Sequence, residues 1–157
     1  MTILGFDPGR DKTGFAFINN SGSLLASGIF PTQDQQAIFT ALLPPSSYDT
    51  LSQFLLEGSI TSLTSPLDFI AIGSGTHSKA FTENARAALP FEILTVDEKN
   101  TTLEARRLYW TLHKPGLFTR LLPEGLRVPK RILDDLAAWA IALRALKKYR
   151  DIRRNKL

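Results

Sequence analysis

The chain has 157 residues, the length of one domain, of which 43% are hydrophobic and 22% charged. This composition excludes a disordered or collagen-like chain, and the absence of cysteine excludes disulfides and thiolate zinc sites. No apolar run reaches the roughly 20 residues of a membrane helix, and the amino-terminal residues lack the features of a signal peptide, so we expect a cytoplasmic protein without a membrane partner.

Positive charge is concentrated in the last third of the chain. Residues 1–98 carry 4 Lys and Arg against 10 Asp and Glu, whereas residues 99–157 carry 15 against 5. The net charges of the two parts are therefore −6 and +10, which sum to the +4 of the whole chain. A segregated basic segment is typical of proteins that bind a phosphate backbone, although a solvated helix end would have the same composition. The charge distribution favours a nucleic-acid partner.

Three short apolar segments at the start of the chain predict an antiparallel meander, because turn residues separate them closely. These predicted strands cover residues 2–7, 14–19 and 23–30. Helical spacing of apolar residues follows, interrupted by a Pro-Pro-Ser-Ser breaker, and predicts helices over 35–43 and 50–63.

The second half of the chain alternates between strand and helix patterns. The predicted elements are strands 67–73 and 91–96, helices 78–89 and 101–112, a loop over 113–128, and a long helix from Pro129 to about Arg150. Together they predict an α/β fold with a five-stranded mixed sheet, in which the first three strands are antiparallel, the last two parallel, and helices cover both faces. We expect a single domain over residues 1–150 and a frayed basic tail over 151–157.

Acidic residues occur where the predicted elements would bring them to one end of the sheet. Asp7 ends the first strand before Pro-Gly, Asp97 and Glu98 follow the fifth, and Asp134 and Asp135 lie early in the last helix. Ligands of open α/β sheets gather at the carboxyl ends of strands. Each acid taken singly also has an ordinary structural role, in a turn or at a helix start.

Carboxylates without cysteine suit Mg²⁺ or Mn²⁺, which prefer oxygen ligands. Two such ions could stabilise the attacking and leaving oxygens of a phosphodiester displacement. The turn after Asp7 also carries Arg10 and Lys12, whose cations could reach a bound phosphate. It lacks the Gly-Lys-Ser/Thr ending of a P-loop.

Three motifs in this order resemble the YqgF/RuvX family of RuvC-like nucleases, in the RNase H-like superfamily. They are Gly-Phe-Asp-Pro-Gly-Arg-Asp-Lys-Thr-Gly at 5–14, Val-Asp-Glu-Lys-Asn-Thr-Thr-Leu-Glu-Ala-Arg at 96–106, and Asp-Asp-Leu-Ala-Ala at 134–138. The resemblance implies an RNase H-like nuclease in which Asp7, Glu98 (or Asp97) and Asp134 hold the metal. Lys99 and Asn100 replace the more usual Arg-Leu, and residues 72–76 lack the strand-end Glu of RuvC itself, which favours the YqgF type.

Members of this family are linked to Holliday-junction resolution and to trimming of precursor 16S rRNA during ribosome biogenesis, and both substrates stay open here. We expect catalytic roles for Asp7, Glu98 and Asp134, with Asp97 and Asp135 as further metal ligands. The residues expected to bind nucleic acid are Arg10, Lys12, Lys99, Arg127, Lys130, Arg131, Lys147 and Lys148.

Tyr109 and Trp110 could stack on bases, although aromatic residues of such a helix more often belong to the core. A binding protein of the same fold that no longer cuts is the alternative function. An actin-type ATPase would need a second lobe for which the chain is too short. The chain could act as a monomer or as a homodimer.

Overall fold

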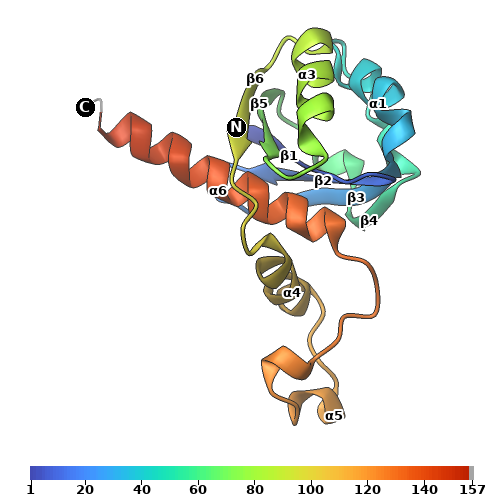
Figure 1. Ribbon diagram of the computed structural model, residues 1–157, viewed down its shortest axis with the longest axis vertical. Coiled ribbons are helices and arrows are strands. Elements are labelled where there is room, and N and C mark those ends of the chain that lie inside the picture. Colours follow the sequence, from blue (N-terminus) through green and yellow to red (C-terminus); the bar gives the residue numbers. More distant parts are fainter. Residues whose placement is uncertain (156–157) are drawn as a thin grey trace.

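The computed structural model describes residues 1–155, in which six strands form one mixed sheet of order β4-β3-β2-β1-β5-β6 (Figure 1). The strands are β1 (Thr2–Pro8), β2 (Lys12–Asn19), β3 (Leu24–Pro31), β4 (Leu55–Gly58), β5 (Leu67–Gly73) and β6 (Glu92–Val96). The first four pair antiparallel in sequence order, whereas β5 pairs parallel with β1 and β6 parallel with β5. The predicted α/β class and mixed sheet are confirmed.

Helices cover both faces of the sheet, as predicted (Figure 1). The α-helices are α1 (Gln35–Leu42), α2 (Asp49–Ser52), α3 (Ser78–Ala88), α4 (Thr101–Leu112), α5 (Leu117–Arg120) and α6 (Asp134–Arg154). Short 3₁₀ turns occupy Thr32–Asp34, Ile60–Ser62 and Glu124–Leu126. Within the part of the chain that the structure describes, no helix has the length and apolar character needed to cross a bilayer.

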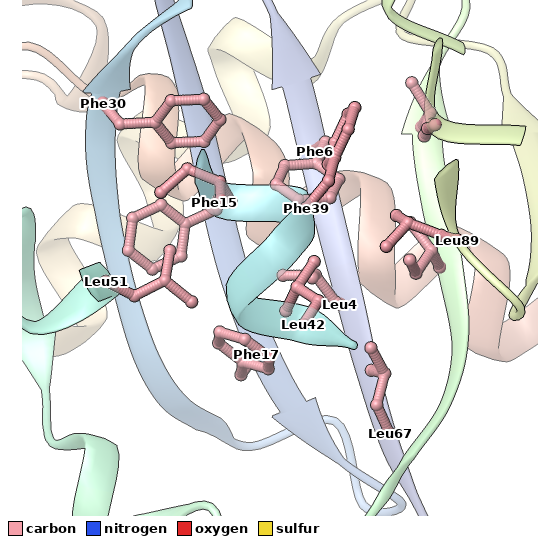
Figure 2. Close-up of a cluster of buried hydrophobic side chains, with 14 of the residues drawn as sticks. Leu4, Phe6, Phe15, Phe17, Phe30, Phe39, Leu42, Leu51, Leu67 and Leu89 are labelled. Carbon is pink, nitrogen blue, oxygen red and sulfur yellow. The ribbon is translucent and has the colours of Figure 1, made fainter. Parts of the chain in front are cut away.

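Two apolar cores lie on opposite faces of the sheet, because alternate strand residues point to opposite sides. On one face, phenylalanines from β1, β2 and β3 pack under α1 and α3; Phe6 contacts Phe39 and Phe81 edge to face (Figure 2). On the other face, small residues of β1 and β2 lie under α6, with α4 packed alongside it. The second core therefore holds α6 directly against the two central strands.

Three predicted boundaries are wrong. The sheet has six strands and not five, because the segment predicted as helix 50–63 contains only α2 before it extends into β4 at the sheet edge. The last helix begins at Asp134 and not at Pro129, since the preceding residues form an irregular connection. The tail predicted to be frayed from residue 151 stays helical through Arg154; residues 156–157 lie outside the described part.

The connection between α4 and α6 projects away from the sheet and carries α5 (Figure 1). Its apolar side chains face solvent: Leu117, Phe118, Leu121 and Val128 are each at least 80% exposed. The loop predicted over 113–128 is thus irregular for most of its length, although it contains two short helical turns.

Candidate active site

Asp7 occupies the carboxyl end of the central strand β1, where it is partly buried. Its neighbour across the β1–β2 pair is Gly14. A Cβ at Gly14 would overlap the carbonyl oxygen of Asp134, so the first turn of α6 rests on the strand backbone beside Asp7. The glycine therefore brings two acidic residues, 127 positions apart in the chain (134 − 7), to one end of the sheet.

Glu98 approaches the same place from β6, the strand on the far side of β5. It follows the strand by two residues, and its side chain lies over the turn that begins at the end of β5. A Cβ at Gly75 would overlap the Glu98 carboxylate, and one at Gly73 would come within 3.0 Å of its Oε2. Glycine at both positions thus leaves the space that the carboxylate fills.

The electrostatics of Asp7 show that the three acids act on one another. Burial first, and then the negative charges of Asp134 and Glu98, raise the pKa of Asp7 from its ordinary value of 3.8 to about 7. The pKa of Asp134 is also raised, by burial and by the neighbouring Asp135, while the Lys12 ammonium partly offsets the shift. The neighbouring acids therefore disfavour the charged form of Asp7, and Lys12 favours that of Asp134.

Asp135 does not belong to this group, which corrects its predicted role as a metal ligand. Its side chain is fully buried and points into the protein, where both of its oxygens have partners. The Ser27 hydroxyl donates to Oδ2 at 2.7 Å, and the Arg131 guanidinium donates to Oδ1 at 2.7 Å and Oδ2 at 3.1 Å. Both oxygens are therefore committed to hydrogen bonds inside the protein and point away from the other acids.

Arg131 links Asp135 to a second acid, Glu57 on the edge strand β4. The guanidinium donates to Glu57 Oε1 at 2.7 Å, and His113 Nε2 lies 2.6 Å from the same oxygen. Burial opposes ionisation of both partners, but these hydrogen bonds raise the pKa of Arg131 and lower that of Glu57. The Arg131 guanidinium is thus engaged inside the protein, where it ties the start of α6 at Asp135 to Glu57 of β4.

Sequence reasoning missed this internal network. Ser27, Glu57 and His113 carry no pattern in the sequence that would single them out. The only available signal was the spacing of Arg131 and Asp135, which would form an i,i+4 pair if both lay on a helix.

Asp97 is exposed and caps the turn before α4. Its Oδ1 accepts a hydrogen bond from the Lys99 amide at 2.9 Å, and its carbonyl oxygen accepts one from Arg144. Neither contact directs its carboxylate at Asp7, whereas Glu98 contributes to the pKa of Asp7. Of the two alternatives at 97–98, Glu98 is the acid whose charge bears on Asp7.

A cavity of about 280 Å³ opens beside the acids, and both Asp7 and Asp134 line it. Arg106 and Arg131 also line this cavity, but neither acid forms an ion pair with a side chain of residues 1–155, so both carboxylates offer oxygen ligands of the kind that hard cations prefer. The donor chemistry of the pair thus fits Mg²⁺ or Mn²⁺. Over the same residues, however, no three acidic or histidine side chains are gathered closely enough to hold one ion together.

The predicted nucleic-acid residues are scattered around this end and along α6. Exposed cations are found at Arg10 and Lys12 beside Asp7, at Lys99 before α4, at Lys130, and at Lys147 and Lys148 on α6. Arg127 instead folds back to donate to carbonyl oxygens of its own loop, including that of Leu122 at 3.0 Å. Tyr109 is only 5% exposed and packs in the core, which leaves Trp110 as the partly exposed aromatic of the pair.

Comparison with known proteins gives a likeness of fold. No family model matches the chain, and no curated protein matches it. Among solved structures, it is similar to Thermus thermophilus RuvC, with a TM-score of 0.49 and 16% identity over 96% of this chain and 97% of that one. It is also similar to T. thermophilus RuvC in complex with Holliday junction substrate, with a TM-score of 0.49 and 17% identity over 96% of each chain.

Proposed function

We propose that the chain is a nuclease that hydrolyses phosphodiester bonds of nucleic acid with the help of a divalent cation. The observation that carries the proposal is the shared electrostatics of Asp7, Glu98 and Asp134. These three acids come from three distant parts of the sequence, and together with burial they raise the pKa of Asp7 to about 7. Ionised acids placed this close destabilise the folded protein unless a cation offsets their charge. Acids with shifted pKa values in a cavity are also typical of functional sites.

Asp7 and Asp134, which line one cavity, would hold the cation, and Glu98 would add its negative charge to the site. The cation would supply positive charge to the phosphate and lower the pKa of an attacking water. Lys12, which already interacts with Asp134, would neutralise a non-bridging phosphate oxygen. The network around Arg131 would keep the first turn of α6, and hence Asp134, fixed relative to β1.

The proposed partner is nucleic acid bound through its backbone, because exposed cations flank the acids and continue along α6. Contacts of this kind hold a strand without reading its sequence. The motifs at 5–14, 96–106 and 134–138 suggest a YqgF/RuvX-type enzyme, for which branched DNA and precursor 16S rRNA are the two substrates to test. The proposed roles of the acids and of Lys12 are the same for branched DNA and for precursor rRNA, because both substrates present a phosphodiester bond.

One observation favours a second candidate, a binding protein that no longer cuts. The acids are close enough to interact, but over residues 1–155 they do not form a group of three arranged around one ion. A protein of this type would bind nucleic acid through the same cations and show no metal-dependent hydrolysis.

The two candidates are separated by incubating the protein with a four-way DNA junction and with a 16S rRNA precursor, each in Mg²⁺, Mn²⁺ or EDTA. A nuclease cuts at least one substrate with metal and none in EDTA, and Asp7→Asn abolishes the cutting while binding persists. Cutting by Asp7→Asn at the wild-type rate would remove Asp7 from the mechanism. Binding without cutting in either metal would establish the second candidate.

A further inference from the structure

A second cavity, of about 580 Å³, lies at the same end of the sheet as the acids. It is bordered by the last residues of β3, by the start of β4 and by Ile132, which precedes α6. Lys12 pairs with Pro31 in the β2–β3 ladder and lines this cavity, and β2 lies between β3 and the strand that carries Asp7. Arg131 lines both cavities, which places them on either side of a single side chain.

The walls of this larger cavity are almost entirely apolar. Ile29 and Pro31 come from β3, and Phe54 and Leu56 come from the segment that leads into β4. The partly buried Phe54 ring packs against the buried Phe30 with ring centroids 6.3 Å apart, which anchors it at one wall of the hollow. Leu56 and Ile132 remain 45% and 53% exposed at the rim. The hollow therefore offers a rigid aromatic and aliphatic surface to a flat, apolar ligand.

The charges at the rim select for an anionic ligand. Arg131 is neutralised by its hydrogen bonds to Asp135 and Glu57, whereas Lys12 enters no ion pair among residues 1–155. Lys12 lies on β2 two residues before Gly14, whose backbone contacts the carbonyl of Asp134, so its ammonium is carried at the same end of the sheet as the acids. A ligand that spans the two cavities would contact the carboxylates of Asp7 and Asp134 first, then the Lys12 ammonium, and finally the apolar hollow.

A nucleotide has this order of groups, because its phosphate is anionic and its base presents a flat ring face. Stacking on aromatic side chains is how proteins commonly hold bases without reading their sequence. The volume also lies within the range of roughly 300–1,000 Å³ typical of small-ligand sites. An apolar peptide or a second copy of the chain could fill the hollow but would not supply an anionic group for the Lys12 ammonium.

We propose that this hollow, lined by Phe54, Leu56 and Ile132, receives an unpaired base of the nucleic acid whose neighbouring phosphate lies at Asp7 and Asp134. The inference rests on the proposed function and extends it to the class of substrate. A base enters the hollow only when it leaves its duplex, so the site favours strands with unpaired nucleotides, such as branch points, loops or ends. Lys12 bridges the two parts by contacting the phosphate between them.

The proposal is tested by binding, measured in EDTA so that no strand is cut. Fluorescence anisotropy compares an eight-nucleotide thymidine strand with an abasic strand of equal length and charge. For the wild-type protein we expect the abasic strand to bind roughly tenfold more weakly, the loss typical of one stacked base. In the double variant Leu56→Ser/Ile132→Ser, which changes two partly exposed side chains, the two strands should bind with nearly equal affinity.

The matched control is Leu43→Ser/Ile152→Ser, which removes two similarly exposed apolar side chains, 38% and 46%, far from the hollow. It should keep the wild-type preference for bases. Equal binding of both strands by the wild-type protein, or an unchanged preference in the Leu56 and Ile132 variant, would overturn the inference. These outcomes are independent of cutting. Metal-dependent cleavage without a base preference would support the proposed nuclease function and contradict the base-binding role of the hollow.

Discussion

Asp7→Asn is expected to stabilise the fold above neutral pH, although it removes a proposed catalytic group. The folded-state pKa of Asp7 is about 7, against 3.8 for an ordinary aspartate. Between these values the folded protein holds a proton that the unfolded chain has released, so stability falls as pH rises from about 4 to 7. Above pH 7 the folded protein carries the full cost of a charged, partly buried carboxylate.

The size of this cost follows from the pKa difference. At about 1.4 kcal/mol per pKa unit, a shift of roughly three units corresponds to about 4 kcal/mol. Asp7 keeps some contact with solvent, which lowers the expected effect to roughly 2–3 kcal/mol. Asparagine has nearly the same shape and no charge, so the variant should gain this amount at pH 8 and almost nothing at pH 4.

Urea unfolding of both proteins at pH 4.5 and pH 8 measures the effect, and the difference between the two proteins cancels the titration of other groups. Addition of Mg²⁺ at pH 8 should stabilise the wild-type protein more than Asp7→Asn, because the cation offsets the charge that the variant lacks. A stability difference that is the same at both pH values would refute the reasoning. It would mean that Asp7 is neither desolvated nor repelled by Asp134 and Glu98.

Three further changes test the surroundings of the acids. Gly14→Ala should lower cleavage by about 100-fold in a turnover assay, because its methyl group would push the first turn of α6 away from β1. Asp135→Ala should destabilise the fold by roughly 3 kcal/mol in urea unfolding, since it leaves the partly buried Arg131 with Glu57 as its one carboxylate partner and the buried Ser27 hydroxyl without its acceptor. Lys148→Gln should weaken binding of any nucleic-acid sequence and lower the slope of log affinity against log salt by about one unit.

Each change has a matched control. Gly125→Ala should keep wild-type turnover, because no atom lies within 4 Å of the added methyl group. Asp151→Ala removes an exposed acid of the same helix and should change stability by less than about 1 kcal/mol. Lys79→Gln, on α3 across the sheet, should leave the salt slope unaltered. Equal effects in a variant and its control would contradict the role assigned to the variant residue.

The buried strands and the amphipathic helices could be predicted because the spacing of their apolar residues fits only one type of secondary structure. The continuous apolar run of β5 (Leu67–Gly73) suits a strand buried on both faces, and the predicted bounds agree with the structure. The bounds of α4 (Thr101–Leu112) also agree. The segment around Leu51 and Leu55 failed because apolar residues four apart fit a helix, although here they belong to one helical turn and the start of an edge strand.

For the candidate site, the positions of the acids in the chain could be predicted but the directions of their side chains could not. Asp134 and Asp135 are adjacent, and neighbours on a helix point roughly 100° apart, so one faces the cavity and the other the core. Which one does so depends on Arg131 and Ser27, which reach Asp135 only in the folded protein. The direction of the Arg131 side chain could not be predicted either, because Asp135 and Glu57, which accept its hydrogen bonds, come from other parts of the chain.

The 21-residue length of α6 has a consequence for the size of the ligand. Asp134 stands at one end of this helix and Lys147 lies 13 positions later (147 − 134), which at a rise of 1.5 Å per residue separates their backbones by about 20 Å. Successive base pairs of a duplex are spaced about 3.4 Å apart. For the proposed substrate, a duplex arm that lay along α6 would have to extend about six base pairs beyond the bond at the acids to reach Lys147, and a shorter arm would lose that contact.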